Sequence, residues 1–177
     1  ARTLVAQKLA QDTDRGDAEK DLLRAMTELI FVPEKMMETQ ILSPDAHDLV
    51  RRCKARGHNV YILSNWGSES YELMSKEYPD FFSLFDGILI SGHTGLAKPD
   101  PAIYELLLSQ FKLQAHDCIF LDDQKVNIDA ARTCGISGIH VTQSHSLFSS
   151  SIDFKNVKNQ LLAWEAKQRF TPHAISY

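Results

Sequence analysis

From residue 41 onward, short apolar runs alternate with amphipathic segments along the chain. The apolar runs predict four strands, at residues 60–64, 88–90, 118–121 and 139–141. The segments between and before them predict four helices, at residues 44–56, 68–77, 101–111 and 126–134. Short apolar strands that are separated by helices are typical of a parallel sheet covered on both faces. The pattern therefore predicts an α/β fold, a three-layer Rossmann-like parallel sheet.

The helix predicted at 44–56 has clear signals at both ends. Ser43 is a preferred N-cap residue, and Pro44 suits the first helical position because its missing N–H is not needed there. Gly57 follows the basic end of the segment, and glycine readily adopts the left-handed conformation that ends many helices. These signals predict both boundaries of this helix.

The N-terminal part of the chain predicts helices and no strand. Leu22, Leu23 and Met26 fall at helical spacing behind an acidic stretch, and Pro33 ends the segment. We interpret residues 1–40 as a partial helical cap.

The remainder of the chain, residues 41–177, is interpreted as the core. Near its end, residues 144–151 form a polar stretch that we interpret as a linker. Phe154 and Val157 then begin an apolar stripe at helical spacing, which predicts a final helix packed on the sheet. We expect residues 171–177 to be frayed.

The composition restricts the class of protein and its partners. The chain has 177 residues, of which 44% are apolar, and these values fit one globular domain or a core with a small accessory lobe. The formal net charge of −4 offers no positive field for a nucleic acid or an anionic membrane surface. Cys53, Cys118 and Cys134 lack the spacing of a zinc site, so we expect reduced thiols and a cytoplasmic location.

Candidate chemistry gathers where the predicted strands end. Ser64 and Asn65 end the run at 60–64, Lys98 lies in the loop after 88–90, and Asp122 and Asp123 end the run at 118–121. Ligands of parallel sheets bind outside the carboxyl ends of the strands. A hydroxyl, an ammonium group and two carboxylates around one crevice suit a phosphate group and Mg²⁺.

These residues resemble the motifs of a known family. Three segments, in order and on the expected elements, look like motifs II, III and IV of the haloacid dehalogenase superfamily: Ser64-Asn65, Lys98-Pro99, and Phe120-Leu121-Asp122-Asp123 with residues 127–132. The residues of these motifs are most similar to those of one subgroup, which contains bacterial glucose-1-phosphate phosphatases and the N-terminal phosphatase domain of soluble epoxide hydrolases. The resemblance implies a phosphatase of a small phosphorylated metabolite.

The resemblance also implies roles for individual residues. Ser64 and Asn65 would bind the phosphoryl oxygens, and Lys98 would neutralise the charge of phosphate and nucleophile. Asp123 would act in catalysis through Mg²⁺, which it would hold together with Asp122. Asn127, on the following helix, would support that metal site from behind.

One motif of the family is missing. The family carries its aspartate nucleophile in an Asp-x-Asp motif at the end of a first strand, which lies in the middle of a sheet with the order 5-4-1-2-3. Asp12-Thr13-Asp14 is the near match, but no apolar run precedes it. Without that strand, the runs at 60–64 and 118–121 would face each other with unpaired backbone groups. We therefore expect a longer chain or a separately supplied strand, and an inactive isolated fragment.

Two other functions stay open on the sequence. A 2-haloacid dehalogenase would share the serine and the lysine, but it would not need the acidic pair. A catalytically silent phosphate-binding or partner-binding module would result if the nucleophile strand is truly absent. The sequence leaves the substrate and the oligomeric state open.

Overall fold

A computed structural model describes residues 8, 11, 16–31, 33–34, 43–146 and 149–170 of the chain. Its helices of eight or more residues are α2 (Asp17–Phe31), α4 (Pro44–Ala55), α5 (Ser68–Glu77), α8 (Pro101–Gln110), α9 (Lys125–Thr133) and α10 (Phe154–Phe170). Its shorter helices are α6 (Pro79–Phe82), α7 (Ser91–Thr94) and the 3₁₀ turn η1 (Ala115–Asp117). Its strands are β1 (Tyr61–Ser64), β2 (Gly87–Ile90), β3 (Ile119–Asp122), β4 (Ser137–His140), β5 (Gln143–Ser146) and β6 (Ser149–Ile152).

The predicted α/β fold is confirmed. The four predicted strands are β1 to β4, each within three residues of its predicted boundaries, and they form two parallel pairs. In the first pair Ser64 lies opposite Ile90, and in the second pair Asp122 lies opposite His140. The predicted site residues Ser64 and Asp122 therefore lie at the carboxyl ends of their strand pairs.

The two parallel pairs are separate sheets. Among the described residues, β1 pairs with β2 alone and β3 pairs with β4 alone. This arrangement agrees with the expected gap between the strands at 60–64 and 118–121. One edge of β1 and one edge of β3 thus lack a strand neighbour in the described part of the chain, although backbone groups normally need partners when they are buried.

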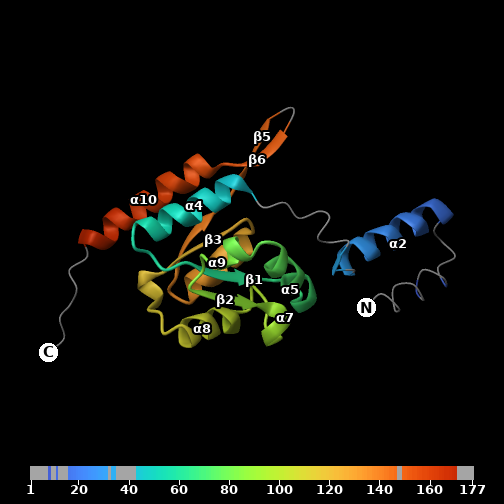
Figure 1. The fold of residues 1–177 in the computed structure, drawn as a ribbon, viewed down its shortest axis with the longest axis horizontal. Coiled ribbons are helices and arrows are strands. Elements are labelled where there is room, and N and C mark those ends of the chain that lie inside the picture. Colours follow the sequence, from blue (N-terminus) through green and yellow to red (C-terminus); the bar gives the residue numbers. More distant parts are fainter. Residues whose placement is uncertain are drawn as a thin grey trace.

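Helices cover the strands on both sides (Figure 1). In this view α4 and α10 run side by side above the strands, and α8 lies below them. Ile103 and Tyr104 of α8 are completely buried against the strands. The core cluster joins residues of β1 and β2 with residues of α8, of α9 and of the position before β4, namely Leu63, Leu89, Ile103, Tyr104, Leu107, Ala131 and Ile136. Phe120 of β3 is partly buried and packs against this cluster.

The predicted ends of α4 are confirmed. The Ser43 hydroxyl accepts a hydrogen bond from the Ala46 amide at 3.4 Å. Gly57 has a φ of +85°, and the amide of His58 donates to the carbonyl of Cys53 at 3.1 Å. This is the hydrogen-bond pattern of a helix that ends at a left-handed glycine.

Helix α10 is anchored to the end of α4 by an ion cluster. The buried carboxylate of Glu165 accepts hydrogen bonds from Arg56 and binds His58 Nε2 at 2.7 Å. Val157, also on α10, is 2% exposed. The predicted packing of the final helix on the core is therefore confirmed.

The linker predicted at 144–151 is wrong. Residues 143–146 and 149–152 pair as an antiparallel ribbon, β5 and β6, in which Gln143 lies opposite Ile152. Figure 1 shows this ribbon projecting from the body next to α4 and α10. The polar composition indicated solvent exposure, but backbone pairing in a two-stranded ribbon does not require an apolar alternation.

The N-terminal segment is helical where it is described. Helix α2 begins at Asp17 with acidic residues in its first turn and ends two residues before Pro33, as predicted. Its apolar side chains Leu22 and Met26 are 60% and 48% exposed. Residues 12–15, with the Asp12-Thr13-Asp14 near match, and the frayed end predicted at 171–177 lie outside the described residues. The division into cap and core stays a prediction.

No helix in the described part of the chain is long and apolar enough to cross a membrane.

Candidate active site

The loops after β1 and β2 lie directly against each other. The amide of Gly92 donates to the carbonyl of Trp66 at 2.9 Å, and the Ser91 hydroxyl donates to the same carbonyl at 3.2 Å. A Cβ atom on Gly92 would overlap the backbone nitrogen of Ser68. Only glycine therefore fits at this contact, which brings the residues after Ser64 close to the loop that carries Lys98.

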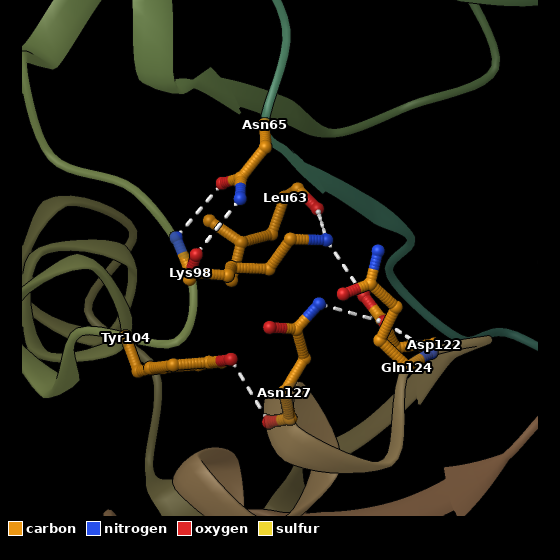
Figure 2. A network of polar contacts seen from close by, with 7 residues as sticks. All are labelled: Leu63, Asn65, Lys98, Tyr104, Asp122, Gln124 and Asn127. Carbon is orange, nitrogen blue, oxygen red and sulfur yellow. Dashed lines mark hydrogen bonds and ion pairs between the residues drawn. The ribbon is translucent and has the colours of Figure 1, made fainter.

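Asn65 forms two hydrogen bonds with the main chain of Lys98 (Figure 2). The Lys98 amide donates to Asn65 Oδ1, and Asn65 Nδ2 donates to the Lys98 carbonyl, both at 2.8 Å. The side chain of Asn65 thus binds the protein rather than pointing away from it. This partner was not evident from the sequence, since the two residues are 33 positions apart.

The side chain of Lys98 connects the two sheets at their carboxyl ends. Its Nζ donates to the carbonyl of Leu63 on β1 at 2.9 Å and to Asp122 Oδ2 on β3 at 2.7 Å. The ammonium group also lies 5.2 Å from the centre of the Phe120 ring, within the range of a cation–π contact. The Lys98 and Asp122 side chains are only 10% and 5% exposed, so water screens this ion pair weakly.

Asp122 is bound on both carboxylate oxygens. Lys98 donates to Oδ2, while the Gln124 amide at 2.8 Å and Asn127 Nδ2 at 2.9 Å both donate to Oδ1. Burial raises the pKa of Asp122, but the hydrogen bonds from Lys98, Asn127 and Gln124 outweigh burial and place the pKa below its usual range. Asp122 is therefore a stable anion whose oxygens are already engaged by protein donors.

Asn127 is held in place by a buried tyrosine. The Tyr104 hydroxyl donates to the carbonyl of Asn127 at 2.9 Å. Burial, followed by the nearby charge of Asp122, raises the pKa of Tyr104 to about 12, so it remains a neutral donor at neutral pH. A tyrosine on the apolar face of the predicted helix at 101–111 was the available sequence signal, because a buried hydroxyl usually needs a partner. Tyr104 was not among the predicted site residues.

Asp123 is exposed, unlike its neighbour. Its carbonyl accepts a hydrogen bond from His140 Nε2 at 3.0 Å, and its carboxylate has no hydrogen-bond partner among the described residues. Mg²⁺ prefers oxygen ligands, usually keeps several waters, and takes one or two carboxylates together with substrate phosphates. The carboxylate of Asp123 suits such a site, whereas Asp122 in this geometry would act through its hydrogen bonds.

No group of three or more His, Cys, Asp and Glu side chains is placed to hold a metal within the described ranges. Ser64 lies at the end of β1, half-buried, and its hydroxyl has no hydrogen-bond partner there either. The structure thus brings Asn65, Lys98, Asp122 and Asn127 into one network. It leaves the Ser64 hydroxyl and the Asp123 carboxylate available at the same end of the strands.

Comparisons with known proteins agree with this arrangement. The family model of haloacid dehalogenase-like hydrolases matches residues 2–135, which is most of the chain and includes every candidate site residue. The chain belongs to the haloacid dehalogenase-like hydrolases. The resemblance noted in the sequence is thereby confirmed at the level of the superfamily.

Two curated relatives match part of the chain. The chain is 36% identical to a sesquiterpene phosphatase of Aspergillus oryzae, over 60% of this chain and 55% of that protein. It is 34% identical to a bifunctional epoxide hydrolase 2 of Sus scrofa, over 50% of this chain and 16% of that protein. The chain thus spans about half, or less, of these relatives.

A solved family member from Bacteroides thetaiotaomicron supports the fold. Its structure, a complex with magnesium and inorganic phosphate, matches with a TM-score of 0.57 and 20% identity, over 73% of this chain and 71% of that chain.

Proposed function

We propose that this chain forms the main part of a Mg²⁺-dependent phosphatase that hydrolyses phosphate monoesters through an aspartyl-phosphate intermediate. One observation carries the proposal. A buried lysine and a buried aspartate form an ion pair between two sheets, at the edge where ligands of parallel sheets bind. The named phosphatase among the relatives supports the same reaction class.

Lys98 and Ser64 would act on the phosphoryl group. The Lys98 ammonium group is held by Asp122 and by the Leu63 carbonyl, so it is already oriented before a substrate arrives. A preorganised cation stabilises negative charge that develops on a transferring phosphoryl group. The Ser64 hydroxyl, at the end of β1, would donate a hydrogen bond to a phosphoryl oxygen.

The exposed carboxylate of Asp123 would hold Mg²⁺, with Asp122 and Asn127 fixing the loop behind it. Bound there, the metal ion would neutralise phosphate charge and orient the substrate. The solved family member is a complex with magnesium and inorganic phosphate, which supports a requirement for Mg²⁺. His140 supports it from the neighbouring strand, because its hydrogen bond to the Asp123 carbonyl fixes the main chain at this residue.

The nucleophile would be an aspartate on a strand between β1 and β3, supplied from outside the described residues. Attack of its carboxylate on phosphorus would form the acyl phosphate and release the alcohol, and water would then hydrolyse that intermediate. In the described part of the chain, one edge of β1 and one edge of β3 have no strand neighbour, which favours the proposal, since an inserted parallel strand would satisfy both edges.

The test is an assay of the whole protein with two readouts. Phosphate release is measured with a generic aryl phosphate and with a sesquiterpenyl monophosphate, and halide release is measured with a 2-haloacid, each with Mg²⁺ and with EDTA. We expect phosphate release that EDTA abolishes and that added Mg²⁺ restores. Halide release that persists in EDTA would instead establish the dehalogenase. Release of neither phosphate nor halide would favour the catalytically silent binding module. The sesquiterpenyl substrate is included because of the fungal relative.

A further inference from the structure

We propose that Asn65 is a positioning residue for Lys98, and that it acts by binding both polar groups of the Lys98 main chain. The inference rests on the proposed function for its catalytic consequence and on geometry alone for the contact itself. The family motif marks Asn65 as a substrate-binding residue. Its carboxamide instead donates to the Lys98 carbonyl and accepts from the Lys98 amide, at 2.8 Å each.

The two hydrogen bonds fix the lysine more firmly than one would. A single contact lets a peptide rotate about it, whereas contacts to both the N–H and the C=O of one residue restrict its position and its orientation. Asparagine and glutamine are the only side chains that offer an amide donor and a carbonyl acceptor together. Asparagine has the shorter side chain and loses less rotamer freedom when it is fixed.

The side chain of Lys98 explains why its backbone needs this support. A lysine side chain is long and flexible, yet Nζ must reach the Leu63 carbonyl and Asp122 Oδ2 at the same time. Asn65 follows the end of β1, the strand that also presents the Leu63 carbonyl. Residues at the carboxyl end of β1 therefore bind both the backbone of Lys98 and the tip of its side chain (Figure 2).

The competing explanation is direct contact between Asn65 and the substrate. After both contacts to Lys98, the carboxamide still has one N–H and one lone pair available. The two explanations differ in what happens when Lys98 is absent. A positioning residue loses its effect on catalysis, whereas a residue that contacts the substrate keeps it.

The experiment compares four single variants and one double variant of the whole protein. Asn65→Ala removes both contacts, and Asn65→Asp keeps an acceptor for the Lys98 amide but removes the donor. Lys98→Met provides the background for a double variant with Asn65→Ala. Ser91→Ala is the matched control, because Ser91 joins the same two loops through the Trp66 carbonyl and forms no hydrogen bond with Lys98 among the described residues.

Two readouts are measured, hydrogen exchange of the Lys98 amide and steady-state phosphate release over a range of substrate concentrations. In Asn65→Ala we expect the Lys98 amide to exchange at least about fivefold faster. We expect kcat to fall by about 100-fold with little change in KM, as for a misplaced catalytic group. Asn65→Asp should retain the protection of the Lys98 amide and lose part of kcat, and Ser91→Ala should leave both readouts unchanged. In the Lys98→Met background, Asn65→Ala should have no further effect on kcat.

Unchanged exchange of the Lys98 amide in Asn65→Ala would overturn the proposal. So would an equal loss of activity from Asn65→Ala in the presence and absence of Lys98, which would establish direct substrate contact. If the unmodified protein releases no phosphate, the proposed function fails, and the exchange readout still decides whether Asn65 positions Lys98.

Discussion

The β1–β2 pair and the β3–β4 pair have the same parallel geometry, yet they hold the polar residues at their carboxyl ends in different ways. In the first pair the contacts run to main-chain atoms, since Asn65 binds the backbone of Lys98 and Lys98 binds the Leu63 carbonyl. In the second pair they converge on one side chain, the carboxylate of Asp122. The first pair thus places a cation, and the second places an anion.

The comparison shows how a charged site is built across two sheets. Within the described residues the two pairs share no strand hydrogen bonds, and at their carboxyl ends Lys98 and Asp122 join them. Buried ion pairs add little net stability by comparison with apolar residues, but removal of one partner is costly. The pair is therefore better explained by its position at the site than by its contribution to folding.

The largest effect is expected from Lys98→Met, which removes the cation of the first pair. It leaves a buried carboxylate without its counter-ion, so we expect a loss of about 3 kcal/mol in the free energy of unfolding. Phosphate release should fall by about 10³-fold. Urea unfolding and a phosphate assay measure the two effects. The double variant Lys98→Met with Asp122→Asn should be more stable than the single one; a double variant that is less stable would contradict the ion-pair account.

The next largest effect is expected from Asp123→Asn, which tests the metal-binding role proposed for the second pair. The change removes one carboxylate charge at an exposed position, so the fold should be unaffected. Phosphate release at a fixed Mg²⁺ concentration should fall by about 100-fold, and part of the loss should be recovered at higher Mg²⁺. Asp129→Asn is the control, since Asp129 is a half-exposed acidic residue of the following helix that pairs with Lys125 and Arg132. Equal effects of the two changes would refute the role of Asp123.

A smaller effect is expected from pH, through the anion of the second pair. The pKa of Asp122 is lower in the folded protein than in the unfolded chain, so the unfolded chain binds the proton more readily. Its contribution to stability is therefore present above about pH 4 and is lost as the pH falls through the folded pKa. Urea midpoints of the unmodified protein should fall more steeply below about pH 4 than those of Asp122→Asn. If the urea midpoints of the two proteins depend on pH in the same way, the ionised form of Asp122 does not contribute to stability.

The smallest effect is expected from Tyr104→Phe, which removes one neutral hydrogen bond behind Asn127. The ring stays buried, but the Asn127 carbonyl loses the hydroxyl donor. We expect a loss of about 1 kcal/mol in the free energy of unfolding and a change in kcat of less than about threefold. A much larger loss of kcat would show that the hydroxyl of Tyr104 has a part in the reaction.

Local signals account for what could be predicted from the sequence. Ser43, Pro44 and Gly57 mark a helix through contacts within one turn, so both ends of α4 were predicted. The order of Ser64, Lys98 and the acidic pair likewise indicated the superfamily and the edge of the sheet where the site lies.

The unpredicted features depend on contacts between distant residues. Asn65 meets the Lys98 main chain only after two strands have paired, and nothing in either segment indicates that contact. The different environments of Asp122 and Asp123 also depend on which side of β3 faces the core. The ribbon of β5 and β6 was missed because its pairing does not follow from an apolar pattern.

The most direct test of the central claim is a crystal structure of the whole protein with Mg²⁺ and inorganic phosphate. The account predicts the metal ion on the carboxylate of Asp123, and the phosphate within hydrogen-bond distance of Lys98 Nζ and the Ser64 hydroxyl. Phosphate and metal bound away from the carboxyl ends of β1 and β3, with the Lys98–Asp122 pair unchanged and facing no ligand, would contradict it.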